Sequence, residues 1–273
     1  MGTLSVCMSV YKNERADYLK DSLNSIIAEQ TRKPDEIVLI VDGPVLEDLD
    51  EVIECFDCLY PDLFNIIRLS ENKGLGFALK LAVEKAKCDY IARMDTDDIS
   101  LPGRFEKQIT FLEKNPDIDV VGGAIEEIDE RGNSRGKIVV YPEAPAECRK
   151  FFAKRNPHAH PAVMFRRRYF EKAGCSYRED YRNNQDTMLW FDGMMAGTQH
   201  ANLQDVVLKF RVTEAMFKKR RNGWRFAKKQ LKDRFMINKG LGYGIGADIY
   251  GLVMFGLLIS PVWIKRIAYN IFR

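Results

Sequence analysis

The chain has 273 residues, enough for one large α/β domain with an appendage or for two small domains. Hydrophobic residues make up 46% of it and the net charge is only +3, which allows a sizeable core and argues against a general nucleic-acid binder. The six cysteines follow no disulfide-like spacing and the first residues do not resemble a signal peptide, so we expect reduced thiols and a cytosolic protein.

The first part of the chain predicts an alternation of strands and helices. Short apolar runs at 4–10, 36–41, 64–69 and 90–94 are typical of buried strands. Helical spacing of apolar residues fills the intervals, over 16–30, 45–59 and 75–87. Four strands alternating with three helices predict right-handed βαβ units and a parallel sheet.

Beyond residue 98 the pattern changes. We expect a helix over 102–115 and two strands, over 119–128 and 137–141, joined by a turn at 129–133. A proline-bracketed loop at 156–161 leads into a strand over 162–165, and a helix over 186–196 and a strand over 206–212 follow.

Polar residues follow each of the four predicted parallel strands. In sheets of this kind, ligands bind outside the carboxyl ends of the strands, so these side chains are expected to converge on one crevice. They are Asn13 and Glu14, Asp42, Asn72 and Lys73, and then Asp95, Asp97 and Asp98.

The segment that follows the fourth strand places three carboxylates within four residues, at Asp95, Asp97 and Asp98. Like charges this close repel and raise one another's pKa, and a divalent cation bound between them removes that penalty. Mg²⁺ and Mn²⁺ take oxygen ligands, usually carboxylates together with substrate phosphates. The sequence therefore predicts a place where a metal holds a diphosphate. The alternative is that these aspartates cap the following helix.

Several blocks carry a resemblance to a known family. They are Ser9-Val10-Tyr11-Lys12-Asn13-Glu14, residues 34–39 with Asp42-Gly43, residues 72–76, residues 92–98 with Pro102, Arg104 and Phe105, and Asn156-Pro157 with His160-Pro161. Over roughly residues 3–212 the chain resembles the inverting family 2 glycosyltransferases with the GT-A fold, above all the bacterial enzymes that build capsule, exopolysaccharide and O-antigen chains.

The resemblance implies an α/β fold of the GT-A type, with a Rossmann-like, mainly parallel sheet flanked by helices. Residues 1–213 would form the catalytic domain, divided into a nucleotide-sugar-binding half over 1–98 and an acceptor-binding half over 99–213. Residues 214–273 would form a basic and apolar helical tail.

The resemblance also implies a nucleotide-diphosphate sugar donor, a UDP-sugar in the first place, and a divalent cation, Mg²⁺ or Mn²⁺. Asp95 and Asp97 match the family's Asp-x-Asp pair and would meet the metal. Asp42 would accept a hydrogen bond from the uridine base, although it also suits a turn before Gly43. The positions expected to contact the nucleotide-sugar are Ser9, Tyr11, Glu14, Asp42, Asn72, Lys73, Arg93, Asp95 and Thr96, and for Lys73 a solvated lysine is an equal alternative.

Asp186 matches the family's general base, which takes the proton of the acceptor hydroxyl; the alternative is a helix cap. Gln185 stands where glutamate is usual, which puts acceptor binding and rate in question. His160 and Trp190 match the acceptor side, but a structural loop histidine is an equal reading of His160. A core tryptophan is the favoured reading of Trp190.

The tail begins with a basic run, because residues 214–239 carry ten Lys or Arg against two acidic residues. An apolar run over 249–264 follows, shorter than the roughly 20 residues that a membrane span needs. We expect an interfacial or re-entrant segment beside a basic helix that attracts anionic lipid. A buried helix packed on the domain and a transmembrane helix are the alternatives. Nothing else in the chain supports nucleic-acid binding.

These expectations combine into an inverting glycosyltransferase that adds a sugar to a glycan, lipid-linked by expectation, in bacterial surface polysaccharide biosynthesis. It would work as a peripheral or monotopic protein on the cytoplasmic face of the inner membrane. The alternative is a catalytically impaired, membrane-associated assembly protein that still binds nucleotide-sugars, for which Gln185 is the support. A nucleotidyltransferase is disfavoured because residues 9–14 lack the glycine-rich loop that normally follows its first strand.

Overall fold

The computed structural model describes residues 2–172, 176–179, 181, 184–213 and 224–261. Its centre is a nine-stranded mixed sheet with the order β3-β2-β1-β4-β8-β6-β9-β5, and β7 pairs with β6 outside this path. The strands are β1 (Leu4–Val10), β2 (Glu36–Val41), β3 (Phe64–Arg68), β4 (Tyr90–Arg93), β5 (Ile99–Ser100), β6 (Val120–Ile128), β7 (Ser134–Val139), β8 (Met164–Arg166) and β9 (His200–Arg211).

The first four strands form the parallel part of the sheet, as predicted. β1 lies between β2 and β4, and β3 pairs with the outer edge of β2, all in parallel register. Because parallel strands present their carboxyl ends at one edge, the loops after β1, β2, β3 and β4 meet there. β8 then runs antiparallel between β4 and β6, and β9 is parallel to β6, which extends the sheet into the second half of the chain.

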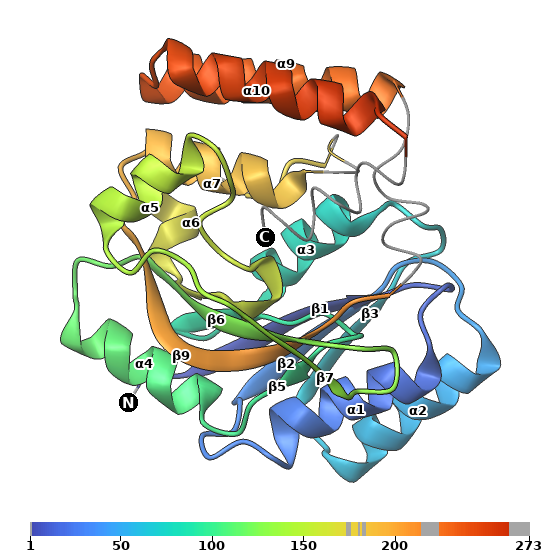
Figure 1. The fold of residues 1–273 in the computed structure, drawn as a ribbon. Helices are drawn as coiled ribbons and strands as arrows, with labels where there is room; N and C mark the ends of the chain where they lie inside the picture. Colours follow the sequence, from blue (N-terminus) through green and yellow to red (C-terminus); the bar gives the residue numbers. More distant parts are fainter. Residues whose placement is uncertain (1, 173–175, 180, 182–183, 214–223, 262–273) are drawn as a thin grey trace.

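Helices cover both faces of the sheet (Figure 1). On one face lie α1 (Ala16–Ile27), α2 (Glu47–Leu59) and α4 (Arg104–Lys114). On the other lie α3 (Leu75–Lys85), α5 (Pro145–Phe152), α6 (Arg168–Lys172) and α7 (Gln185–Met195).

Residues of the central strands alternate between two apolar cores, one on each face of the sheet. Val6 and Met8 of β1 join the core under α1, α2 and α4, whereas Cys7 between them joins the core under α3 and α7. Side chains alternate across a strand, so a strand that is covered on both faces reads as a continuous apolar run. This explains why the sequence predicts β1 and β2 to the residue.

The second half departs from the sequence-based expectations in several places. His160–Ala162 form a 3-10 turn, η1, so β8 begins at Met164 rather than at residue 162. β7 begins at Ser134, three residues before the predicted strand, and β9 begins at His200 rather than at residue 206. The short elements β5, α5 and α6 were not predicted at all.

Two C-terminal helices, α9 (Trp224–Leu241) and α10 (Ile245–Ile259), lie side by side above α7, as a further layer over the molecule (Figure 1). Ile237 and Leu241 of α9 belong to the same core as α3 and α7, so the inner face of the tail packs on the domain. Residues 214–223 of the predicted basic run and 262–264 of the predicted apolar run lie outside the described residues. In the described part of the chain, none of the helices is both long enough and apolar enough to cross a membrane.

Candidate active site

The loop after β4 is fixed by hydrogen bonds to its neighbours. The Met94 amide donates to the Cys7 carbonyl in the middle of the paired strand β1, at 3.2 Å. The Ser22 hydroxyl of α1 donates to the Asp95 carbonyl at 2.8 Å. These contacts leave the side chains that follow β4 at the carboxyl edge of the sheet, where the sequence predicted them.

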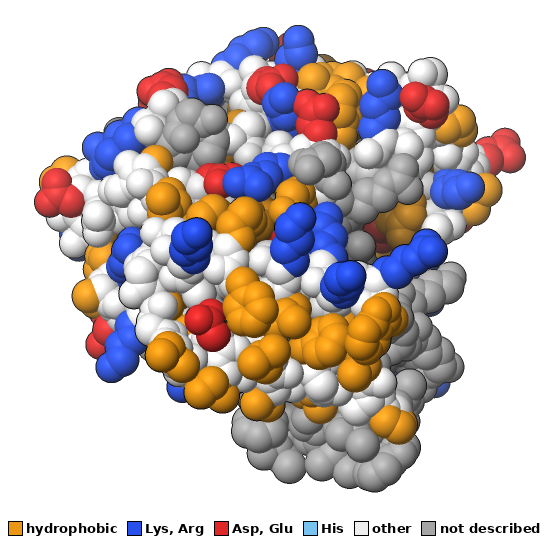
Figure 2. All heavy atoms as spheres, turned by 90° about the horizontal axis from the view of Figure 1, so that it is seen from above, with side chains coloured by type: hydrophobic (Ala, Val, Ile, Leu, Met, Phe, Trp, Pro, Cys, Tyr) orange, Lys and Arg blue, Asp and Glu red, His pale blue; other side chains and the backbone are white. Residues whose placement is uncertain are grey.

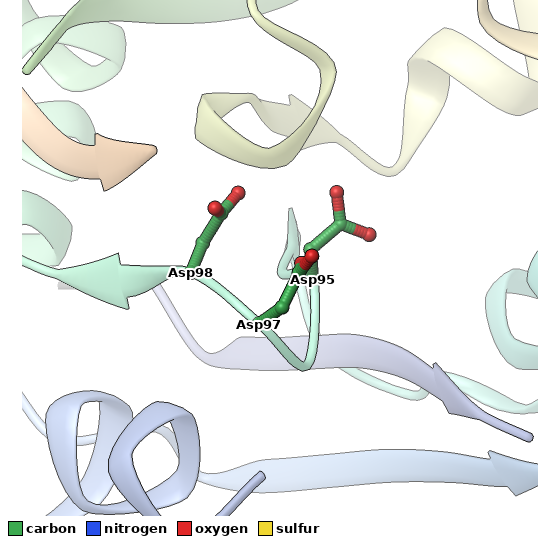
Figure 3. A group of neighbouring side chains, drawn as sticks. All are labelled: Asp95, Asp97 and Asp98. Carbon is green, nitrogen blue, oxygen red and sulfur yellow. The ribbon is translucent and has the colours of Figure 1, made fainter. Parts of the chain in front are cut away.

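Asp95, Asp97 and Asp98 bring their carboxylates together on the same side of this loop (Figure 3). One oxygen from each lies within 4.8 Å of the others. The alternative that these residues cap the next helix is wrong, because residues 99–100 form β5 and Gly103 is the residue that precedes α4. An all-oxygen cluster of this size suits a hard divalent cation.

Asp98 is the buried member of the cluster. Its Oδ1 accepts a hydrogen bond from the Arg211 amide of β9 at 2.8 Å, whereas its Oδ2 has no partner within the described part of the chain. Burial first, and then the charges of Asp97 and Asp95, raise the pKa of Asp98 well above its ordinary value. An unpartnered buried carboxylate oxygen beside two other carboxylates fits a site that takes a cation.

Arg93 brings a positive charge to the edge of the cluster. Its guanidinium is 3% exposed and forms an ion pair with Asp95 through Nη2, while Nε and Nη1 have no hydrogen-bond partner among the described residues. Burial is the largest single influence and acts against the charged form, but Asp95, Tyr177 and Asp98 together outweigh it and raise the pKa of Arg93. The guanidinium therefore stays charged, with two buried donors left over for a ligand.

Asp42 organises the loop after β3 from the end of β2. Its carboxylate accepts hydrogen bonds from the Lys73 amide at 2.7 Å, the Gly74 amide at 2.9 Å and the Asn72 side chain at 2.9 Å. An ionised carboxylate has about four acceptor positions, so roughly one is left for a ligand. Gly74 has a φ of 92° in this turn, a conformation that favours glycine. The Lys73 side chain is exposed, which agrees with the alternative of a solvated lysine.

The other predicted donor-site residues lie on the same edge. Ser9 is half-buried near the end of β1, and Tyr11 and Glu14 are half-buried in the loop that follows, closed by a hydrogen bond from the Glu14 amide to the Tyr11 carbonyl at 3.0 Å. Thr96 is buried between Asp95 and Asp97.

Asp186 lies in the first turn of α7, and Asn156, from the loop between α5 and η1, holds it. Asn156 Nδ2 donates to Asp186 Oδ2 at 2.9 Å, and the Thr187 hydroxyl donates to Asn156 Oδ1 at 3.1 Å. The helix cap is Asn184, so the capping reading of Asp186 is wrong. Gln185, the first residue of α7, is half-buried beside it.

Half-buried His160 is paired with buried Tyr177. His160 Nε2 and the Tyr177 hydroxyl are 2.8 Å apart. Burial and then Arg93 lower the pKa of His160 well below its ordinary value, so the imidazole is neutral. Burial is the main cause that raises the pKa of Tyr177; Arg93 opposes it, whereas Asp186 and Asp95 add to it. Tyr177 therefore lies within electrostatic reach of both Asp95 and Asp186.

Trp190 is completely buried, which agrees with the favoured core reading and leaves no face of the indole exposed for a sugar. It packs against His158, His200 and Phe165. His158 Nε2 and His200 Nδ1 are 3.0 Å apart, and burial lowers the pKa of His158 to about 4. This histidine pair and His160 all contact the same Trp190 ring.

Three residues of the site were not assigned a role from the sequence. Asn156 was part of a matched block, but its contact with Asp186 joins positions 30 residues apart. Tyr177 and Arg211 reach the site from the segment before α7 and from β9. A polar residue in a proline-bracketed loop was the available signal for Asn156; nothing in the local pattern marks the other two.

Comparisons with known proteins agree with this geometry. The family model "Glycosyl transferase family 2" matches residues 5–174. "Amylovoran biosynthesis glycosyltransferase AmsE" of Erwinia amylovora is 37% identical over 272 residues, which cover 97% of this chain and 97% of that protein. "UDP-Gal:alpha-D-GlcNAc-diphosphoundecaprenol beta-1,3-galactosyltransferase" of Escherichia coli is 30% identical over 233 residues, 85% of this chain and 82% of that protein. The crystal structure of S. aureus TarS 1–349 with UDP-GlcNAc shares the fold, with a TM-score of 0.67 at 15% identity, over 94% of this chain and 82% of that chain.

Proposed function

The chain belongs to glycosyl transferase family 2, and from this premise we propose that it moves a sugar from a UDP-sugar to a lipid-linked glycan, with inversion, in bacterial surface polysaccharide biosynthesis. That it is a glycosyltransferase follows from the family. The observation that supports the specific reaction is the acidic cluster at the carboxyl edge, and the Asp186 carboxylate, held by Asn156, supplies a candidate base.

Asp95 and Asp97, with Asp98 beside them, would hold a divalent cation, Mg²⁺ or Mn²⁺. When bound, the cation would neutralise the diphosphate and stabilise the charge that develops on the leaving nucleotide. Arg93 would also stabilise the negative charge of the donor, because its two unpartnered buried nitrogens would donate hydrogen bonds to a phosphate or sugar oxygen.

The donor would lie along the carboxyl ends of β1 to β4. Asp42 offers its remaining acceptor position to the uracil, while its three hydrogen bonds hold residues 72–74 against the nucleotide. Ser9, Tyr11, Glu14 and Thr96 line the same edge, and Lys73 would reach a phosphate from solvent.

Asp186 would act as the general base. As the acceptor hydroxyl oxygen forms a bond to the anomeric carbon, the bond from that carbon to the phosphate oxygen breaks. The hydroxyl proton passes to the Asp186 carboxylate, and the electron pair leaves with the nucleoside diphosphate. Attack from the face opposite the leaving group inverts the anomeric configuration. Asn156 holds one oxygen of the base and so fixes its orientation.

A lipid-linked acceptor is proposed because a relative covering most of this chain has a diphosphoundecaprenol-linked acceptor in its name. Gln185 adjoins Asp186 at the start of α7 and His160 is paired with Tyr177, and these two side chains would contact the acceptor sugar. With such an acceptor, the protein would act peripherally or monotopically at the cytoplasmic face of the bacterial inner membrane, without a nucleic-acid partner.

The alternative of an impaired nucleotide-sugar-binding assembly protein rests on Gln185 alone. The rest of the constellation favours turnover, because the acidic cluster is intact and Asn156 orients the Asp186 carboxylate. A neutral Gln185 removes one negative charge next to the base, which affects the pKa of Asp186 more than the reaction type.

The proposal is tested with the full-length protein, UDP binding and sugar transfer being measured separately. Asp97→Asn should abolish the Mn²⁺ dependence of UDP binding in calorimetry. Asp186→Asn should leave UDP binding intact and lower transfer by about a hundredfold or more. Asp57→Asn, at an exposed site on α2, should change neither. Transfer at an undiminished rate in excess chelator would refute the metal role, and metal-linked UDP binding without any transfer would favour the assembly protein.

A further inference from the structure

The outward face of α10 is apolar along its whole length. Ile245, Ile249, Leu252, Val253 and Ile259 are all exposed there, at the spacing of one helical stripe. A helix on the surface of a water-soluble domain normally turns charged and polar residues outward, whereas α10 turns apolar residues outward. Contiguous exposed apolar surface marks a place where something else binds.

A basic stripe accompanies it on α9. Arg225, Lys228, Lys232 and Lys239 are exposed at helical spacing, and Trp224 and Phe235 lie among them. Figure 2, which views the molecule from the α9 and α10 side, shows a row of Lys and Arg next to an apolar patch on one face.

The acidic residues of these two helices do not compensate the basic stripe. Asp233 is buried and accepts hydrogen bonds from the Tyr181 hydroxyl and the Asn184 side chain. Asp248 accepts a hydrogen bond from the Asn238 side chain within the helix pair. The outer face therefore combines exposed cations with exposed aliphatic side chains.

We propose that this α9–α10 face docks on an anionic lipid bilayer, with the α10 stripe in the interface and the α9 cations on the lipid phosphates. The inference rests on the proposed function in that a lipid-linked acceptor places the substrate in the same membrane. Amphipathic helices bind such surfaces by burying apolar area and by attraction to anionic headgroups, and both components are present here.

A second copy of the chain is the competing occupant. A twofold contact is self-complementary, so it would bring the same patch of each copy together. Two sets of exposed Lys and Arg would then face one another across the contact, and nothing in the described part of the two helices offers exposed carboxylates against them. The charge of the face therefore favours anionic lipid.

Docking through this face would also place the acceptor side of the site toward the membrane layer. α9 is bonded to the segment that precedes the proposed base, through Asp233 with Tyr181 and Asn184. Deleting the tail would break these bonds together with the docking face, so point substitutions on the outer face are the cleaner test.

The experiment is co-sedimentation of the full-length protein with vesicles of phosphatidylcholine alone and with vesicles in which phosphatidylglycerol replaces part of it. The protein should bind the anionic vesicles more tightly, and salt should weaken this binding. Lys228→Glu with Lys232→Glu should weaken it by about tenfold or more. Leu252→Gln with Val253→Gln should weaken it comparably by removing buried apolar area.

Matched controls lie on the opposite side of the molecule, around α1 and α2. Leu46→Gln with Leu59→Gln changes side chains that are 58% and 63% exposed, compared with 51% and 63% for Leu252 and Val253. Lys20→Glu with Lys33→Glu makes the same charge change. Both controls should bind vesicles like the unaltered protein, and all variants should keep its unfolding temperature.

Equal vesicle binding by face variants and controls would overturn the proposal. So would a dimer, seen by light scattering without lipid, that Leu252→Gln with Val253→Gln converts to a monomer, because the face would then belong to a second copy. The assay contains no donor sugar, so a failure of the proposed transfer reaction would leave its result unchanged.

Discussion

At the residue scale, Asn156 orients the carboxylate of the proposed base, Asp186. Its amide orientation is fixed by chemistry, because Thr187 donates to Oδ1 and only Nδ2 is left to donate to Asp186. A hydrogen bond donated to a carboxylate stabilises its ionised form and lowers its pKa. Asn156 is therefore a positioning residue that also tunes proton affinity.

Asn156→Ala should lower the transfer rate by about tenfold to a hundredfold, the factor that corresponds to the free energy of a hydrogen bond to a charged group. It should leave UDP affinity unchanged, because the Asn156 side chain bonds Asp186 and Thr187 of α7 and not the proposed donor-binding residues. Loss of the hydrogen bond should raise the pKa of Asp186, so the acidic limb of the pH–rate profile should move to higher pH. A lower rate with an unmoved profile would reduce Asn156 to a structural role.

The residues of the site were predictable to different degrees. Asp95, Asp97 and Asp98 are adjacent in the chain, and their crowding is visible without a structure. Asp186 was found only through the family resemblance, because a single aspartate at the start of a helix has no distinctive local pattern. The contacts of Asn156 and Arg211 depend on tertiary folding, and only the proline-bracketed loop of Asn156 gave any signal in the sequence.

At the element scale, α3 and the segment before α7 are packed backbone to backbone. A Cβ added at Gly76, the second residue of α3, would lie 2.8 Å from the Arg178 carbonyl oxygen and 3.1 Å from that of Tyr181. This contact explains why glycine stands here, since a side chain does not fit between the two backbones. The segment it touches contains Tyr177 and leads to the proposed base.

Gly76→Ala should push this segment away from α3 and displace Tyr177 from His160. We expect a lower transfer rate and a loss of about 1–3 kcal/mol in the free energy of unfolding, as for an overpacked core site. Gly246→Ala is the matched control, since Gly246 is also the second residue of its helix and an added Cβ would meet nothing within 4 Å. Transfer rates and urea unfolding curves of the two variants test this prediction. Equal effects of the two substitutions would refute the packing argument.

Elements that are buried on both faces were the most predictable from the sequence. β1 and β2 match the predicted ranges because, apart from Glu36 at the start of β2, the residues of both runs are apolar or small. The start of β9 was missed, because residues 200–205 carry no alternating pattern and extend the strand only by pairing with β6 from Val120 onward. β5 and α6 are too short to show any period.

At the scale of the whole molecule, α9 connects the outer face to the catalytic part. Its inner side joins the core through Ile237 and Leu241. Its Asp233 carboxylate accepts hydrogen bonds from Tyr181 at 3.1 Å and from Asn184, the residue that caps α7, at 3.2 Å. The position of the proposed base therefore depends on a helix whose outer side is free to meet a membrane.

Asp233→Ala should separate these two roles. The Tyr181 hydroxyl and the Asn184 amide would lose their partner, at a cost of about 1–3 kcal/mol in the free energy of unfolding. The start of α7 would be less well held, so transfer should fall by about tenfold while UDP binding and vesicle binding stay unchanged.

Asp248→Ala is the control, because its carboxylate bonds only Asn238 among the contacts that the structure describes for it, inside the α9–α10 pair. This variant should lose stability without a matching loss of transfer. The comparison is made from unfolding curves and transfer rates of both proteins measured side by side. The two variants differ in one respect: Asp233 bonds the segment before α7, whereas Asp248 bonds only within the helix pair. If both substitutions slowed transfer equally, α9 would affect the site only through the stability of the whole fold.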